Sequence, residues 1–112
     1  MARLDIYVNY ERQASIKLEG VEVRVGRDPN CAVQIADPRV SRCHAVISQE
    51  NGNHVIENFS ANGTKVNGRN LDSRQTLIAG DAIFISSYIL VYQPDDAPVE
   101  GLEETVLAHS HR

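Results

Sequence analysis

Hydrophobic and polar positions alternate along short segments of this chain, and turn-forming residues separate the segments. The clearest cases are residues 3–10, 14–20 and 21–26; in the last, three valines alternate with a glutamate and an arginine. A period of two places successive side chains on opposite faces of a strand, so each segment predicts a half-buried β-strand. We expect the remaining strands at residues 32–36, 43–49, 54–59, 75–80, 81–86 and 88–93. No window of 11–18 residues before position 94 has helical periodicity, and the pattern therefore predicts an all-β protein.

Two dipeptides predict how neighbouring strands connect. Asn51-Gly52 separates two predicted strands, and this pair is the strongest short-range signal for a tight hairpin. Glu19-Gly20 predicts a second hairpin between segments 14–20 and 21–26. We expect residues 26–42 and 59–70 to be loops, where binding groups tend to lie on a rigid sheet scaffold.

The distribution of charge separates the end of the chain from the rest. The chain has 112 residues, enough for one domain with one core, and a formal charge of −4. Residues 1–93 contain ten acidic and ten basic side chains, so residues 94–112 carry the whole net charge. The neutral part gives no support for a nucleic-acid partner, which requires a basic surface. Because prolines and acids open residues 94–112, we predict one domain over 1–93 and a flexible acidic tail or linker after it.

Segment composition also bears on where the protein resides. The N-terminus lacks the apolar stretch of a secretory signal, and no apolar run approaches the roughly 20 residues needed to cross a bilayer. Cys31 and Cys43 do not make a disulfide framework. We therefore expect a cytoplasmic protein with reduced thiols and no membrane partner.

The stretch PRVSRCHAVI, residues 38–47, contains residue types used in catalysis and metal binding. Ser41 and His44 lack the strained elbow that presents a hydrolase serine, and on an extended segment they would point to opposite faces. Cys43 and His44 lack the paired spacing of a structural zinc site. We predict no enzyme, no metal and no cofactor, and expect the His44 ring to hold neighbouring loops together.

Anion binding fits the predicted loops better. Their basic side chains are Arg27, Arg39, Arg42, Lys65 and Arg69. A guanidinium group matches phosphate oxygens with two parallel hydrogen bonds, and a serine hydroxyl adds a short charge-assisted bond. These residues predict a receptor for phosphate or carboxylate; the alternative is a set of solvated surface arginines.

Four short motifs in order extend this interpretation. They are Gly26-Arg27, Ser41-Arg42-Cys43-His44, Asn62-Gly63-Thr64 and Val66-Asn67-Gly68. Their order and spacing resemble the forkhead-associated (FHA) domain, over roughly residues 3–93. The resemblance implies an all-β, FHA-like β-sandwich of two twisted antiparallel sheets, with about eleven short strands and the binding loops at one end.

The same resemblance implies roles for individual residues. Arg27, Ser41 and Arg42 would bind phosphate, and Asn62 would bind the peptide backbone. The implied loop-architectural residues are Gly26, His44, Gly63, Thr64, Asn67 and Gly68, with the glycines at turns. One position departs from the family: a hydroxyl that often touches phosphate is replaced by Ala61.

The function implied is a phosphothreonine-dependent protein–protein interaction module in Ser/Thr-kinase signalling. The alternative is a phosphate-independent FHA-like scaffold or dimerisation module. Thr105, in the acidic tail, is a possible phosphosite that could occupy the binding site of the same or another copy. The competing interpretation of the tail is a linker to a downstream domain.

Overall fold

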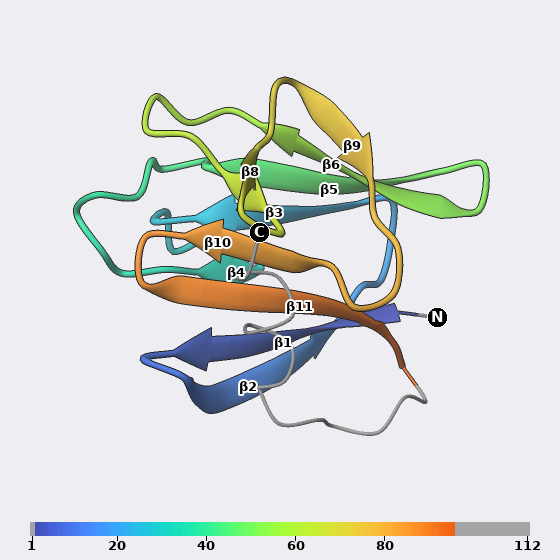
Figure 1. The fold of residues 1–112 in the computed structure, drawn as a ribbon, viewed down its shortest axis with the longest axis horizontal. Helices are drawn as coiled ribbons and strands as arrows, with labels where there is room; N and C mark the ends of the chain where they lie inside the picture. Colours follow the sequence, from blue (N-terminus) through green and yellow to red (C-terminus); the bar gives the residue numbers. More distant parts are fainter. Residues whose placement is uncertain (1, 96–112) are drawn as a thin grey trace.

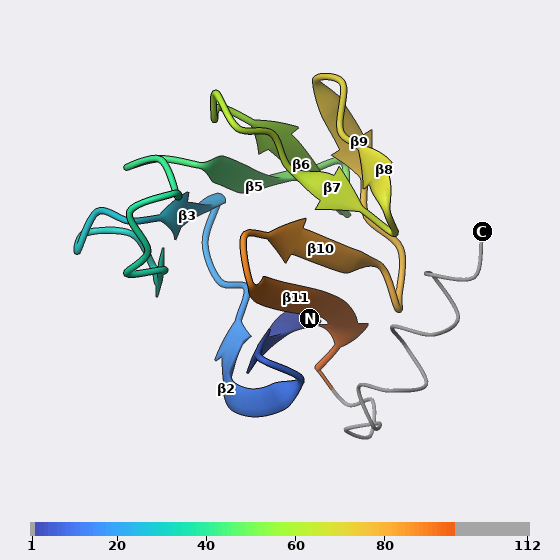
Figure 2. The same cartoon turned by 60° about the vertical axis from the view of Figure 1, so that its left-hand side comes forward.

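The computed structural model describes residues 2–95, and these residues form two stacked β-sheets (Figures 1 and 2). They contain no helix, and hence none that could span a membrane. The eleven strands are β1 (Ala2–Val8), β2 (Glu11–Lys17), β3 (Glu22–Gly26), β4 (Val33–Gln34), β5 (Ala45–Glu50), β6 (Asn53–Asn58), β7 (Lys65–Val66), β8 (Arg69–Asn70), β9 (Arg74–Thr76), β10 (Ala82–Ile85) and β11 (Tyr88–Pro94). The predicted all-β sandwich is confirmed.

The strand order divides the chain between the two sheets. The six-stranded sheet has the order β2-β1-β11-β10-β7-β8, and the five-stranded sheet has the order β4-β3-β5-β6-β9. Neighbouring strands are antiparallel except for β3 and β4, which pair in parallel over two residues each. The five-stranded sheet is therefore antiparallel only from β3 onward, a small difference from the expectation.

The core lies between the two sheets and is made of the side chains that the main strands point inward. Its most buried large side chains, each at most 1% exposed, include Leu4, Ile83 and Leu90 of one sheet and Ile47 and Ile56 of the other. Burying one such side chain stabilises the folded state by about 1.5–3 kcal/mol. The alternating apolar residues, such as Leu4 and Ile6 of β1 and Val23 and Val25 of β3, therefore point inward, whereas β10 and β11 are apolar on both sides.

Two hairpin predictions had different outcomes. Asn51 and Gly52 have φ angles of 51° and 81° and connect β5 to β6, as expected. The Glu19-Gly20 hairpin is wrong, because β2 pairs with β1 while β3 pairs with β4 and β5 in the other sheet. Residues 18–21 instead carry the chain from one sheet to the other.

Two hairpins occur where the pattern predicted none. Asn9 and Tyr10, with φ angles of 53° and 66°, turn the chain between β1 and β2. Alternation through Tyr10 had predicted a continuous strand there, although Asn tolerates the left-handed region. Within the predicted loop 59–70, Asn67 and Gly68 form the turn between the short strands β7 and β8.

His54 of β6 and Tyr92 of β11 connect the two sheets at the end where β11 finishes. The His54 Nδ1 atom and the Tyr92 hydroxyl oxygen are 2.7 Å apart, and the rings meet edge to face. Burial lowers the pKa of His54 below its ordinary 6.5, because desolvation disfavours the charged imidazolium.

This shift predicts a pH-dependent stability. Between the lowered pKa and 6.5 the unfolded chain binds more protons than the folded one, so the free energy of unfolding should fall as the pH drops below 6.5. His54→Asn removes the titrating group and keeps a polar atom near Tyr92. In urea unfolding at pH 7.5 and 5.5, the parent should lose more stability on acidification than this variant. Equal losses would contradict the assignment to His54.

Candidate functional site

Two loops meet at the end of the sandwich opposite His54. One connects β3 to β5 and spans residues 27–44, interrupted by the two residues of β4; the other follows β6 and spans residues 59–64. Both extend to the left in Figure 1, next to the turn between β10 and β11. Arg27, Ser41, Arg42 and Asn62 lie on these two loops, whereas Lys65 and Arg69, also predicted to be loop cations, lie on β7 and β8.

Gly26 allows the first loop to fold back against β3. The Arg27 N–H donates to the Ser41 carbonyl oxygen at 3.0 Å, and the Asp28 N–H donates to the Arg42 carbonyl oxygen at 3.2 Å. A Cβ atom on Gly26 would lie 2.1 Å from that Arg42 oxygen. Gly26 is thus the last residue of a strand rather than a turn residue with positive φ, and glycine is needed for the close backbone approach.

The three arginines of the first loop differ in their partners. The Arg27 Nε donates to the Val40 carbonyl oxygen at 3.0 Å, which fixes the guanidinium group beside Ser41. Within residues 2–95, neither Arg27 nor Arg42 forms an ion pair, and both side chains are exposed. Of the three arginines in this loop, these two are available to an anion.

Arg39 is already paired inside the loop. Its Nη2 lies 2.9 Å from Asp37 Oδ2, and the Ser86 hydroxyl donates to the same oxygen at 2.7 Å. Hydrogen bonds from Arg39 and Ser86 hold the pKa of Asp37 well below its usual range. The pair ties the first loop to the β10–β11 turn, a contact that the sequence did not reveal because Asp37 and Ser86 lie far apart in the chain.

The buried ring of His44 connects the two loops through one hydrogen bond to each. The Ser41 backbone N–H donates to Nδ1 at 3.2 Å, so Nδ1 accepts and the ring proton of the neutral imidazole lies on Nε2. Nε2 then donates to the Gly63 carbonyl oxygen at 2.9 Å, and the ring is only 2% exposed. With both nitrogens engaged by backbone groups, His44 is not placed to act as a base for the Ser41 hydroxyl.

Residues 41–44 also differ from the predicted geometry. They form a bend before β5 rather than part of a strand, so the expected opposite orientation of Ser41 and His44 does not apply. The Ser41 hydroxyl has no hydrogen-bond partner among residues 2–95 and is available to a ligand. Across the same residues, no three His, Cys, Asp or Glu side chains are grouped as metal ligands would be.

Asn62 connects the second loop to the first. Its Nδ2 donates to the Arg39 carbonyl oxygen at 2.8 Å, which leaves the Oδ1 atom and one N–H for a further partner. Gly63 follows with a φ of 86°, in the left-handed region that favours glycine. Ala61 is exposed beside them and contributes no polar group.

Asn58 organises the second loop and was not identified from the sequence. Its Oδ1 accepts from the Ser60 backbone, the Ser60 hydroxyl and the Thr64 hydroxyl, the last at 2.8 Å. The Ser60 hydroxyl in turn accepts from the Gly63 N–H at 2.8 Å, so it is engaged inside the loop. An Asn at the end of a strand is a known turn former, and that is the signal that could have found it.

Asn67 has an architectural position away from the phosphate-binding candidates. Its Oδ1 accepts from the Ala82 N–H and its Nδ2 donates to Asp81, each at 2.8 Å, tying the β7–β8 turn to the start of β10. Between this turn and Asn62 lies a hollow of about 440 Å³. Its lining residues are Asn62, Gly63, Lys65, Gly68, Asn70, Phe84 and Ser86. Of the two predicted cations in this part of the chain, Lys65 therefore lines the hollow and Arg69 does not.

A comparison with protein-family models gives a match to the FHA domain over residues 23–86. The chain belongs to the FHA domain family. The matched range contains all four motifs that suggested the family. No curated protein matches the chain by sequence.

Solved FHA domains have the same fold as this one. EmbR of Mycobacterium tuberculosis, solved in complex with a low-affinity phosphopeptide, is 28% identical with a TM-score of 0.78, covering 88% of this chain. The match covers 26% of the EmbR chain, so this chain spans about a quarter of its length. The FHA domain of Chlamydia trachomatis CT664 is also 28% identical, with a TM-score of 0.76 over 86% of this chain and 98% of that one. The N-terminal FHA domain of S. cerevisiae Rad53p, solved with a phosphothreonine peptide, is 24% identical with a TM-score of 0.72, covering 84% and 94% of the two chains.

The structure thus brings four predicted ligand-binding residues to one end of the domain: Arg27, Ser41, Arg42 and Asn62. The residues that hold the two loops in place are Gly26, His44, Gly63 and Thr64. Asn67 and Gly68 lie on a separate turn. Thr105 lies outside the described residues, as does most of the predicted tail.

Proposed function

We propose that this FHA domain is a phosphothreonine-dependent interaction module that binds a phosphorylated peptide or protein segment on its loop end. The observation that carries the proposal is the set of unsatisfied groups there. Arg27 and Arg42 have no acidic partner within the described residues, and the Ser41 hydroxyl lies between them in sequence with no internal hydrogen bond.

The proposed mechanism is charge-assisted hydrogen bonding without chemistry on the ligand. A phosphothreonine carries about −1.5 to −2 charge at neutral pH and three strong acceptor oxygens. Arg27 and Arg42 would donate to these oxygens together with the Ser41 hydroxyl, while Asn62 would fix the neighbouring peptide backbone. We propose no enzymatic activity, because His44 is engaged by backbone groups on both nitrogens.

The family and one relative support this ligand class. EmbR, at 28% identity, was solved with a phosphopeptide. Ala61 gives no hydroxyl to the phosphate, and a net hydrogen bond to a charged group contributes about 1.5–3 kcal/mol. We therefore propose that Arg42 carries a larger share of phosphate binding here.

The proposed setting is a Ser/Thr-kinase signalling pathway in the cytoplasm, which is consistent with two free cysteines, Cys31 and Cys43. The competing function is a phosphate-independent scaffold or dimerisation module. The two differ in whether a partner must be phosphorylated.

An oriented library of phosphothreonine peptides tests the proposal directly. Binding should be selective for phosphorylated members, measured by fluorescence polarisation or by enrichment on immobilised protein. Treatment of the bound peptides with phosphatase should abolish it, because each proposed contact to the phosphate disappears. Equal binding of the dephosphorylated peptides would support the scaffold function instead.

A phosphorylated Thr105 is a proposed ligand supplied by the chain itself. Thr105 follows Asp95 by ten residue steps, and an extended chain of that length reaches roughly 33–36 Å, comparable with the 30 Å extent of the molecule. In an NMR titration, a peptide with phospho-Thr105 should shift the amide signals of Arg27, Ser41 and Asn62. The unphosphorylated peptide is the control. An absence of shifts at these amides would contradict the proposal that phospho-Thr105 is a ligand of this site.

A further inference from the structure

The outer face of the six-stranded sheet carries a row of apolar side chains. The register places Tyr7 of β1 opposite Ile89 of β11, and Ile89 opposite Phe84 of β10. Val91 and Ala82 pair in the next row. Neighbouring residues in the same strands belong to the core between the sheets, so these five face the other way and form a cluster of their own.

This cluster is more buried than a solvent-facing sheet surface should be. Tyr7, Ile89 and Val91 are 5%, 7% and 3% exposed. An antiparallel sheet with one face on the core normally presents polar side chains on the other. Among residues 2–95, no other strand is layered on this side of the sheet (Figure 2). The outer face is therefore apolar and little exposed, as a sheet surface is when another segment covers it.

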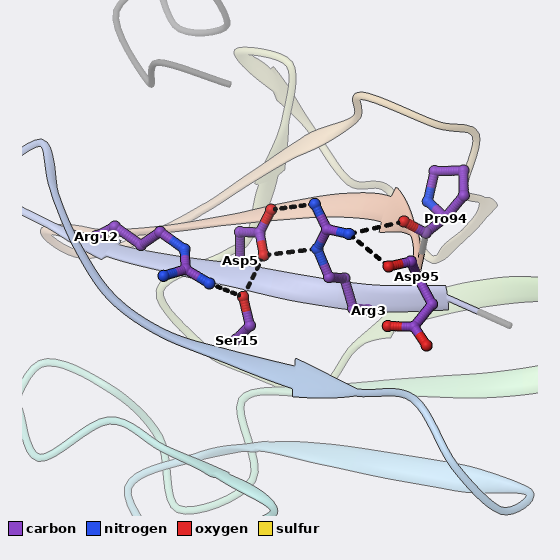
Figure 3. A network of polar contacts seen from close by, with 6 residues as sticks. All are labelled: Arg3, Asp5, Arg12, Ser15, Pro94 and Asp95. Carbon is purple, nitrogen blue, oxygen red and sulfur yellow. Dashed lines mark hydrogen bonds and ion pairs between the residues drawn. The ribbon is translucent and has the colours of Figure 1, made fainter. Parts of the chain in front are cut away.

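The chain leaves the described part of the domain on this same face. Arg3, next to the cluster on β1, forms an ion pair with Asp5 at 2.9 Å between Nε and Oδ1. Its Nη1 donates to the carbonyl oxygens of Pro94 at 3.0 Å and Asp95 at 2.8 Å (Figure 3). Lys17 adds a contact at 3.6 Å between its Nζ and the Asp95 carboxylate. These bonds fix the point from which residues 96–112 depart.

The composition of residues 96–112 complements the face. Val99, Leu102 and Val106 are spaced by three and four residues, which predicts one apolar side on a helix. Asp96, Glu100, Glu103 and Glu104 supply negative charge around them. Basic side chains flank the apolar row on the sheet, since Tyr7 pairs with Arg12 and Phe84 pairs with Lys65.

The length of the segment also fits. Ile89 and Pro94 are roughly 17 Å apart along β11 at about 3.4 Å per residue. Twelve residues span about 18 Å even as a helix, so the segment can run back from Asp95 over the whole apolar row.

We propose that residues 96–112 dock in cis on the outer face of the six-stranded sheet, with Val99, Leu102 and Val106 against the cluster of Tyr7, Ile89 and Phe84. This interaction surface is separate from the loop end, and the proposal does not depend on phosphopeptide binding. The acids of the segment lie toward Arg12 and Lys65 in the docked state.

The full chain labelled with ¹⁵N and ¹³C tests the docking by NMR. Nuclear Overhauser contacts are expected between the methyl groups of Leu102 or Val106 and the ring protons of Tyr7 or Phe84. The double variant Leu102→Asp with Val106→Asp should lose these contacts and shift the amide signals of β1, β10 and β11 on the outer face. Ala97→Asp with Ser110→Asp is the matched control, because it adds the same two carboxylates at other positions of the segment and should preserve the contacts.

Three results would overturn the proposal. Absence of the contacts in the parent chain shows that the segment does not dock there. Unchanged amide signals in the double variant show that the apolar residues are not the anchors. Contacts that arise only between labelled and unlabelled copies in a mixed sample assign the face to a second copy of the chain instead.

Discussion

Replacement of Arg27 by alanine is expected to weaken phosphothreonine-peptide binding below the limit of detection while the domain remains folded. The Arg27 side chain is exposed and contacts the domain through one hydrogen bond from Nε to the Val40 carbonyl oxygen, so little of the fold depends on it. A hydrogen bond to a charged group contributes about 1.5–3 kcal/mol. Loss of one such bond weakens binding by roughly 10- to 150-fold, and loss of a bidentate contact by more.

Ser41→Ala should have the same direction of effect through the loss of one hydroxyl. Lys17→Ala is a charge-matched control for Arg27→Ala, because it removes a positive charge near Asp95 at the opposite end of the sandwich. Isothermal titration calorimetry gives the affinities, and circular dichroism checks the fold. If the Arg27 and Ser41 variants both bind like the parent, the phosphate site is assigned to the wrong residues.

Gly26→Ala should disrupt both the fold and the site. The added Cβ would lie 2.1 Å from the Arg42 carbonyl oxygen, 2.8 Å from the Arg42 carbonyl carbon and 2.9 Å from the Ser41 oxygen. These are backbone atoms and cannot move as a flexible side chain does. Overpacking of this kind costs about 1–3 kcal/mol, and we expect the upper part of that range in urea unfolding. Displacement of Ser41 and Arg42 should also weaken peptide binding by about 10-fold or more.

Gly20→Ala provides the control for this substitution. Gly20 has a φ of 81°, and no atom lies within 4 Å of the position that a Cβ would occupy, so alanine there is strained but meets no neighbour. It should cost about 1–2 kcal/mol of stability and leave peptide affinity unchanged, because it lies far from the loops. Equal affinity losses for the two variants would show that the effect is general destabilisation rather than displacement of the binding loop.

Short sequence patterns predicted a turn correctly where the turn residues themselves fix its conformation. Asn51-Gly52 encodes its own turn, because both residues adopt positive φ at low cost. Glu19-Gly20 led to a wrong hairpin prediction, because a glycine between two strands can also occur where the chain passes from one sheet to the other. Which partner a strand chooses depends on residues far along the chain, and β2 pairs with β1 through a turn at Asn9-Tyr10 that alternation had hidden.

In the candidate site, too, the sequence predicted the residues but not all of their contacts. The motif order identified Arg27, Ser41, Arg42 and Asn62, and the family match covers them. The sequence grouped Arg39 with the other loop cations, yet the fold pairs it with Asp37 and, through Asp37, with Ser86. The Arg39–Asp37 pair is local, but no periodicity or motif spacing contains the Asp37–Ser86 contact, since it depends on how the β10–β11 turn meets the first loop.

By itself, the sequence determined the all-β class, the inward side of the alternating strands such as β1 and β3, the family and the residue types at the loop end. These follow from alternation with a period of two and from motifs whose members must recur in a fixed order. Only the tertiary structure decided which groups remain available to a ligand. Short-range bonds engage Arg39 with Asp37, Ser60 with Gly63 and Nδ1 of His44 with Ser41, and long-range bonds add Ser86 to Asp37 and Gly63 to Nε2 of His44. Arg27, Ser41 and Arg42 keep unsatisfied donors.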